Sequence, residues 1–161
     1  MDQVRGRTLR RRGLEVRPLT KGVGTLIYAL DTQRYLFLLR STGSWSMTWG
    51  LPGGKINESE TVVEGLNREI EEELGGKIYA PKFVPIEIFT SKNEKFMYHT
   101  YFVAVDNEFL PKLNSEHLGY AWLPMSSLPK PLHPGVNRTL NNPEIIEKIR
   151  EAEINCSNGL I

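Results

Sequence analysis

The chain has 161 residues, and its 20 lysines and arginines nearly balance 19 aspartates and glutamates, which leaves a formal net charge of +1. This length is enough for one domain with a sizeable core, and the near-neutral charge gives no reason to expect a nucleic acid or a membrane as partner. The lone Cys156 excludes an internal disulfide framework. No apolar run approaches the roughly 18 residues of a membrane span or forms the core of a signal peptide. We therefore expect a cytoplasmic protein.

Residues 1–16 are predicted to form a basic tail, followed by a single domain over residues 17–156 and a short tail over 157–161. A basic run of this kind can attract polyphosphate or RNA, but it is more often a solvated segment. No aromatic residues interleave with the arginines, so the run offers no stacking surface for single strands, and we expect no nucleic acid partner. These arginines are Arg5, Arg7, Arg10, Arg11 and Arg12.

Strand-like segments lie on both sides of one helical segment. Runs of β-branched, aromatic and leucine residues alternate with short polar turns, as they do in a sheet. Polar turns at 31–33 and 92–95 predict two hairpins, and Pro85 indicates an edge strand or a bulge. The predicted strands cover residues 21–30, 34–39, 78–79, 83–90, 96–105 and 120–123.

A helix is predicted after the glycine-rich loop of residues 49–55 (WGLPGGK). Asn57 is a natural N-cap with Glu60 as its capping partner, and Gly75 and Gly76 supply a stop at the other end. The helix is indicated by one apolar stripe at helical spacing. The stripe consists of Val62, Val63, Leu66, Ile70 and Leu74.

A long loop over 106–119 and a proline-rich connection over 124–134 precede a second helix. This last helix is predicted to begin at Asn142 or Pro143 and to end near Ile154. Its inward-facing residues are predicted to be Ile145, Ile146, Ile149 and Ala152.

The first helix carries glutamates at a spacing that a purely structural helix has little reason to use. Glu69, Glu72 and Glu73 stand at i, i+3 and i+4, so their like charges converge on one flank. At about 100° per residue, Glu73 falls almost inside the apolar stripe, Glu69 falls at its edge and Glu72 lies further round. A charge on a buried face is costly unless it is paired or bound to a metal, and hard oxygen ligands suit Mg²⁺ or Mn²⁺.

The alternative is an amphipathic helix with a solvated acidic side. That interpretation leaves Glu69 and Glu73 unexplained, because other polar residues already fill the solvated face. They are Glu64, Asn67 and Glu71. The glycines of the preceding loop let the backbone approach an ion closely, so a loop carbonyl can join the carboxylates as a ligand.

Residues 54–75 resemble the signature of the Nudix (MutT-like) hydrolases, G-x5-E-x7-R-E-U-x-E-E-x-G-U, in which U is a bulky aliphatic residue. Gly54 is followed after five residues by Glu60, and after seven more by the run REIEEELG, which ends at Gly75. Every fixed charged and glycine position of the signature is therefore present. The final U is Gly76 here, and Ile78 is the expected replacement in the core.

The resemblance implies an α/β fold, an α/β/α sandwich with a mixed β-sheet between helices. It also implies hydrolysis of a phosphoanhydride bond with Mg²⁺ or Mn²⁺, with two or more ions at the site. The implied substrates are nucleoside diphosphate derivatives, such as a dinucleotide or a nucleotide sugar like ADP-ribose. A (d)NTP pyrophosphohydrolase that releases a monophosphate and pyrophosphate is the alternative, and a non-catalytic nucleotide sensor is disfavoured because no box glutamate is missing. Members are often dimers, so a homodimer is a further expectation.

The resemblance also assigns roles to the residues of the box. Glu72, Glu73 and the carbonyl of Gly54 are implied metal ligands, and Glu69 is implied as a ligand or a general base. Arg68 would orient these glutamates as a catalytic residue, which its i, i+4 relation to Glu72 fits. Glu60 would support the start of the helix.

Glu116 lies in the loop before the strand at 120–123, where many Nudix members place an additional glutamate that serves as ligand or base. An ordinary solvated residue is the alternative for Glu116. His117 beside it is interpreted as a phosphate contact, a protonation switch or a surface residue without a role. Trp122 is expected in the core.

Substrate contacts are predicted around the glycine-rich loop. Lys55 and Arg40 lie near it in sequence and are candidates for phosphate contacts, and Trp45 is a candidate for stacking on a base. Tyr98 and Tyr101 point to opposite faces of one strand, so only one of them can line the same pocket.

Overall fold

The computed structural model describes residues 19–78 and 82–161. The predicted basic tail of residues 1–16 and Tyr79 of the predicted strand at 78–79 lie outside the described residues. No helix in the described part of the chain has the length and apolar character needed to cross a membrane.

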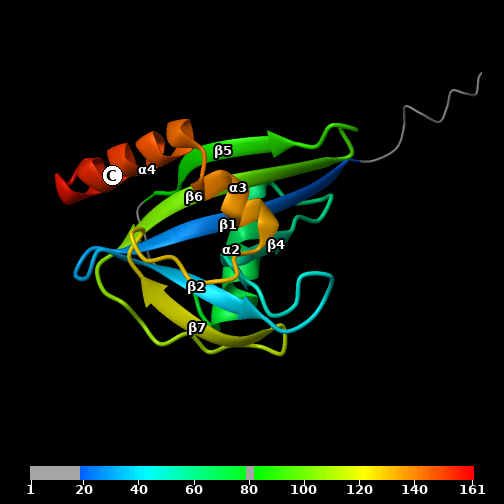
Figure 1. The fold of residues 1–161 in the computed structure, drawn as a ribbon, viewed down its shortest axis with the longest axis horizontal. Helices are drawn as coiled ribbons and strands as arrows, with labels where there is room; N and C mark the ends of the chain where they lie inside the picture. Colours follow the sequence, from blue (N-terminus) through cyan, green and yellow to red (C-terminus); the bar gives the residue numbers. More distant parts are fainter. Residues whose placement is uncertain (1–18, 79–81) are drawn as a thin grey trace, which may run out of the picture.

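One mixed seven-stranded sheet forms the centre of the protein (Figure 1). Its main path runs β3-β2-β1-β6-β5, and β4 and β7 pair additionally with β1 and β2. β1 and β6 are parallel over their whole length, and the other pairings are antiparallel. The strands are β1 (Thr20–Ala29), β2 (Arg34–Arg40), β3 (Trp49–Gly50), β4 (Gly53–Lys55), β5 (Val84–Thr90), β6 (Phe96–Val105) and β7 (His117–Leu123).

Helices cover both faces of this sheet, which confirms the predicted α/β/α sandwich with a mixed sheet (Figure 1). On one face, α2 (Val62–Leu74) packs against alternate residues of β1 such as Val23 and Ile27. On the other face, α3 (Pro134–Leu140) and α4 (Pro143–Ser157) pack against Leu26 and Tyr28. Because neighbouring residues of a strand face opposite sides, β1 contributes to both cores.

The start of α2 differs from the prediction. Thr61, not Asn57, is the N-cap, and it forms a complete capping box with Glu64. The carboxylate of Glu60 does accept a hydrogen bond from the Asn57 N–H at 2.9 Å, but this contact closes a turn ahead of the helix. Gly75 ends the helix in the left-handed conformation with φ of 79°, as predicted.

The apolar stripe of α2 is confirmed at Leu66, Ile70 and Leu74, which are buried. Val63 was wrongly assigned to it and is exposed. Val62, four residues before Leu66, occupies the inward position of the first turn, so its neighbour Val63 turns outward.

Pro85, Ile78 and Trp122 lie in or against the sheet, where predictions had been made for each of them. Pro85 lies in an edge strand, and the register of β5 against β6 shifts between Pro85 and Glu87, so the predicted edge or bulge is confirmed. Ile78 is not in a strand, but it packs against the core beneath α2, as expected for the replacement of the last box position. Trp122 is buried in the same core, as predicted.

Helix α3 was not predicted, and β7 is longer than predicted because it begins at His117 and not at Tyr120. Proline and glycine at residues 134 and 135 indicated a loop, but Pro134 stands in the first turn, where its missing N–H costs nothing. His133 is the N-cap, and its Nδ1 accepts the Gly135 N–H at 3.0 Å. The final helix begins after the predicted cap Asn142 and ends three residues later than predicted, at Ser157.

Candidate active site

Glycines bring the box helix and the preceding loop into direct contact. β4 pairs with β1 at Gly22–Gly24 and packs against α2. A Cβ on Gly54 would overlap the carboxylate of Glu69, and a Cβ on Gly53, whose φ is 151°, would overlap the carbonyl of Val23. The glutamates of α2 therefore lie against the backbone of β4, as the predicted role of the Gly54 carbonyl requires.

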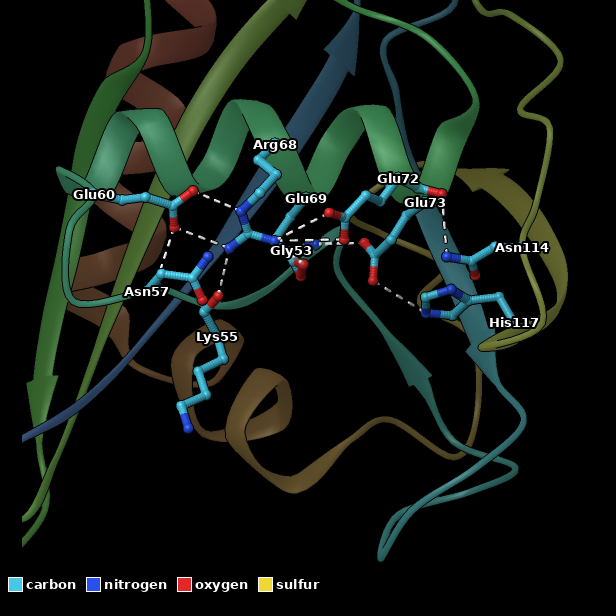
Figure 2. A network of polar contacts seen from close by, with 10 residues as sticks. All are labelled: Gly53, Lys55, Asn57, Glu60, Arg68, Glu69, Glu72, Glu73, Asn114 and His117. Atoms are coloured by element: carbon cyan, nitrogen blue, oxygen red, sulfur yellow. Dashed lines mark hydrogen bonds and ion pairs between the residues drawn. The ribbon is translucent and has the colours of Figure 1, made fainter.

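Arg68 lies at the centre of a polar network that joins β4, the turn before α2 and the helix (Figure 2). Its guanidinium forms a bidentate ion pair with Glu60, with Nε–Oε2 and Nη2–Oε1 distances of 2.6 and 3.0 Å. It also donates to the Lys55 carbonyl at 2.9 Å and contacts the carboxylates of Glu69 and Glu72 at 3.1 and 3.3 Å. The Glu60 carboxylate raises the pKa of Arg68, and Arg68 in turn lowers the pKa of Glu60. These contacts are compatible with the roles predicted for Arg68 and Glu60.

Glu73 is a buried carboxylate, 4% exposed, which confirms its predicted place on the inner side of α2. Its Oε1 accepts the Gly53 N–H at 2.8 Å, and its Oε2 lies 3.9 Å from Nε2 of His117 (Figure 2). Burial raises the pKa of Glu73 to about 8, and the charges of Glu69 and Glu116 act in the same direction. One backbone hydrogen bond is thus a weak compensation for a buried negative charge.

Glu69 and Glu72 project from the same side of the helix into different environments (Figure 2). The Glu69 side chain is 12% exposed, and burial raises its pKa to about 7 against the opposing effect of Arg68. The Glu72 side chain is 53% exposed and contacts Arg68 from the solvent side. Glu73 is thus the most buried of the three glutamates and Glu72 the least, as helical periodicity predicted.

The loop before β7 is attached to the C-terminal end of α2. The Asn114 side chain donates to the Glu72 carbonyl at 3.1 Å, and the Lys112 N–H donates to the Leu74 carbonyl at 2.8 Å. The Asn114 Oδ1 then accepts the Glu116 N–H at 3.0 Å. Asn114 therefore positions the loop, a function that the sequence analysis did not find.

These elements enclose a cleft of about 350 Å³. It brings together acidic side chains from α2 and the 106–116 loop with basic side chains from β2 and β4. Of the predicted site residues, the cleft is lined by Arg40, Gly54, Lys55, Arg68, Glu69, Glu73 and Glu116. Glu60, Glu72 and Trp45 do not line it.

His117 lines the cleft and is 6% exposed in its side chain, so its interpretation as a surface residue is wrong. Burial lowers the pKa of His117, and the charge of Arg40 lowers it further. The buried Nδ1 of His117 and the buried Nε of Arg40 have no hydrogen-bond partner among the described residues. Two polar groups are thus buried without a protein partner beside Glu73, which is typical of a ligand site.

A second cavity, of about 320 Å³, adjoins the cleft and shares Arg40, Gly53, Gly54, Glu73 and His117 with it. Its remaining wall comes from β6, from the segment before β4 and from α3. Apart from Tyr98, which was considered as an aromatic side chain for the base pocket, these residues were not predicted to belong to a site. They include Leu51, Phe96, Tyr98, Thr100, His133, Val136, Arg138 and Thr139.

Tyr98 lies flat on β1 within this second cavity. A Cβ on Gly22 or Gly24 would overlap its ring or its hydroxyl, so both glycines are needed for the close approach. Tyr101 packs against the opposite core, as predicted from the alternation along the strand. Trp45 is half exposed and lines neither cavity, but its ring centroid lies 6.1 Å from that of His133.

The donor set of the cleft suits a hard divalent cation. Within residues 19–78 and 82–161, no three acidic, histidine or cysteine side chains come together closely enough to hold a metal ion as they stand. The pKa values of Glu69 and Glu73 are nevertheless raised because these oxygen donors are buried and crowded, and a bound cation would relieve both effects. The ligand set Gly54, Glu69, Glu72, Glu73 and Glu116 remains a prediction.

Comparison with known proteins assigns the class. The NUDIX domain profile matches residues 18–142, so the chain belongs to the Nudix family. It is 31% identical over 116 residues to Nudix hydrolase 6 of Arabidopsis thaliana, which covers 65% of the chain and 38% of the plant protein. It is 33% identical over 85 residues to the nucleoside triphosphatase NudI of Escherichia coli, which covers 47% of the chain and 60% of that protein.

The fold is also that of solved members of the family. The MutT NUDIX hydrolase from Burkholderia pseudomallei superposes with a TM-score of 0.63 at 28% sequence identity, over 74% of this chain and 94% of that structure. The predicted membership of the Nudix family is therefore confirmed. The chain spans 38% and 60% of the length of these two curated relatives, so membership of the family does not assign their activities to it.

Proposed function

We propose that the chain is a divalent-metal-dependent hydrolase of a phosphoanhydride bond in a nucleoside diphosphate derivative, such as a dinucleotide or a nucleotide sugar like ADP-ribose. The observation that carries this proposal is the composition of the cleft. Buried Glu73 and half-buried Glu69 face the same space as the basic side chains of Arg40 and Lys55. Acidic groups can hold cations there while basic groups neutralise the polyphosphate.

The residues that would hold Mg²⁺ or Mn²⁺ are Glu69, Glu72, Glu73, Glu116 and the carbonyl of Gly54. Such an ion would polarise the phosphoryl oxygens and would lower the pKa of a water molecule bound to it, which would make that water a nucleophile at neutral pH. Several acidic groups at one site allow two or more ions to be held.

The protein's own groups then have distinct tasks. Arg68 fixes Glu69 and Glu72 through its contacts at 3.1 and 3.3 Å, because its other side is anchored on Glu60. A general base must accept the proton from the attacking water. Glu69 is one candidate because its carboxylate lines the cleft, and Glu116 is the alternative from the facing loop.

A (d)NTP pyrophosphohydrolase is a second candidate. It is supported by the name of the bacterial relative, a nucleoside triphosphatase, and by the basic groups Arg40 and Lys55, which suit an additional phosphate. A nucleotide sensor without catalysis has less support, because all charged positions of the box are retained.

The test is a panel of nucleoside triphosphates, dinucleotides and nucleotide sugars with Mg²⁺ or Mn²⁺, with products separated by chromatography. A monophosphate together with a phosphorylated partner supports the first candidate, whereas a monophosphate with pyrophosphate supports the second. Absence of turnover across the panel, with the protein folded and metal present, would contradict both.

A further inference from the structure

The second cavity has an aromatic side suited to a flat ligand. Tyr98 lies beside Phe96, with ring centroids 6.1 Å apart, and opposite Phe89 in the register of β5 and β6. The apolar side chains of Leu51 and Val136 also line it. A cavity of about 320 Å³ with such walls falls in the range of small-molecule sites and suits the ring of a nucleobase.

The polar groups of this cavity are mainly donors. Among the described residues, Glu73, at the end shared with the first cleft, is the one carboxylate in the wall, whereas arginine and histidine side chains occur at several points. Arginine can only donate hydrogen bonds, and the hydroxyls of Tyr98 and Thr100 can donate or accept. A ligand group that faces the arginines must therefore be an acceptor.

His133 also presents a donor. Its Nδ1 accepts the Gly135 N–H at 3.0 Å as the cap of α3, so the proton of the neutral ring lies on Nε2. Burial and the nearby charges of Arg40 and Arg138 lower the pKa of His133, which keeps the ring neutral near pH 7. No hydrogen bond joins Nε2 to any residue within the described ranges, so this N–H is available.

Arg138 is held in place by an aromatic ring. Its Cζ lies 3.6 Å from the centroid of Phe89, a cation–π contact that holds the guanidinium against this ring, and Arg138 is also one of the residues that line the cavity. Among the described residues it forms no ion pair. Arg138 and His133 line this cavity but not the first cleft, whereas Arg40 lines both, so Arg138 and His133 belong to the end of the cavity that is far from the proposed phosphate site.

We propose that this cavity binds the base of the substrate and selects a 6-oxopurine, guanine or hypoxanthine, over adenine. The guanidinium of Arg138 and the Nε2–H of His133 donate to O6 and N7, two neighbouring acceptors that a 6-oxopurine presents on one edge. Adenine keeps N7 as an acceptor but places an amino donor where a 6-oxopurine has O6, so one of the two protein donors meets a donor and is left unpaired. Uracil has a single carbonyl on the corresponding edge and satisfies only one of them. The selection rests on the proposed nucleotide hydrolase function of the adjoining cleft.

The direct test is binding of inosine and adenosine monophosphate to the full chain, measured by calorimetry. The two ligands share the sugar, the phosphate and N7, and they differ in the exchange of the 6-oxo for the 6-amino group, with N1 changing from a donor to an acceptor. We expect inosine monophosphate to bind about tenfold or more tightly, because adenosine monophosphate leaves one buried donor unpaired. Equal affinities, tighter binding of adenosine monophosphate or no binding of either at millimolar concentration would overturn the proposal.

Two variants assign the preference to its residues. Arg138→Gln should reduce the inosine-to-adenosine affinity ratio severalfold, and since Arg138 is exposed, folding should be unaffected. His133→Asp keeps a good N-cap for α3 but replaces a donor by an acceptor, so it should move the ratio toward adenosine. Arg150→Gln, which removes an exposed arginine on α4, is the matched control and should leave the ratio unchanged. A ratio that is the same in all three variants and in the wild type would contradict the assignment.

Hydrolysis assays distinguish the proposed base selection from the proposed hydrolase function. If inosine and adenosine triphosphate, and the matching pair of nucleotide sugars, are cleaved with equal kcat/KM, the base selection fails and the hydrolase function stands. If no nucleotide is cleaved but inosine monophosphate still binds preferentially, the hydrolase function fails and the base site stands.

Discussion

Replacing Glu73 by glutamine tests the buried carboxylate on which the site depends. Burial raises the pKa of Glu73 from 4.5 to about 8, so the folded protein holds this proton more tightly than the unfolded chain does. Between these two values the folded state binds more protons, and the free energy of unfolding therefore falls as the pH rises through this window. Each pKa unit corresponds to about 1.4 kcal/mol, so ionised Glu73 costs the metal-free fold on the order of 3–5 kcal/mol by pH 8.

Glutamine at this position can still accept the hydrogen bond from the Gly53 N–H, but it carries no charge. In the presence of chelator we expect the Glu73→Gln variant to lose the part of this fall that Glu73 causes and to exceed the wild type near pH 8, while the two proteins are similar near pH 5. The raised pKa of Glu69, about 7, leaves a smaller fall in the variant. Adding Mn²⁺ should stabilise the wild type at pH 8 and affect the variant little, because binding to the folded state raises stability. The assay is urea unfolding followed by circular dichroism at several pH values. Identical pH dependence of the wild type and the variant in chelator would refute the reasoning.

The remaining predictions concern the box and its helix. Gly54→Ala should lower kcat/KM and Mn²⁺ affinity at least tenfold, because its Cβ overlaps the Glu69 carboxylate, whereas Gly76→Ala, which has open space around it, should not. Glu69→Gln should lower kcat by about 100-fold or more if Glu69 is the base, and the exposed Glu71→Gln on the same helix serves as control. Thr61→Ala should lower the free energy of unfolding by about 1 kcal/mol, measured in urea, because it removes the N-cap.

Each of these predictions has a contradicting result. Full activity of Gly54→Ala would mean that close packing of β4 against α2 is not needed for the site. A Glu69→Gln variant with wild-type kcat, combined with an inactive Glu116→Gln variant, would transfer the role of base to Glu116. Unchanged stability of Thr61→Ala would mean that the capping box of α2 contributes little to the fold.

Local sequence patterns were sufficient to predict α2 and the relative burial of its three glutamates. The helical period alone placed Glu73 inside, Glu69 at the edge and Glu72 outside, because a helix fixes the direction of each side chain once its apolar stripe is known. The cap could not be chosen in this way. Asn57 and Thr61 are each followed by a glutamate three residues later, so both fit a capping box.

Pairing between strands that are distant in sequence decides whether Asn57 or Thr61 is the N-cap of α2. The Ile56 N–H donates to the Lys21 carbonyl at 2.9 Å, which extends the pairing of β4 with β1. The chain then needs a turn, closed by Glu60, before α2 can begin at Val62. Such a constraint comes from the sheet and leaves no mark within the helix sequence.

The second cavity was missed for the same physical reason. It depends on parallel pairing of β1 with β6, which sets Gly22 opposite Tyr98 although the two residues are far apart in sequence. It also depends on α3, whose proline and glycine resemble a loop when they are read locally. Arg138 and His133 became candidates only after the register of the sheet and the position of this helix were known.

The central claim is that the acidic side chains of α2 and the loop before β7 hold divalent ions against a polyphosphate. The most direct measurement is a crystal structure with Mn²⁺ and a non-hydrolysable nucleotide, with anomalous scattering recorded at the manganese absorption edge. We expect anomalous density within coordination distance of Glu69, Glu73 and the Gly54 carbonyl, with phosphate oxygens as further ligands. Bound nucleotide with no manganese among these carboxylates, or with Glu69 and Glu73 turned away from the phosphates, would contradict the claim.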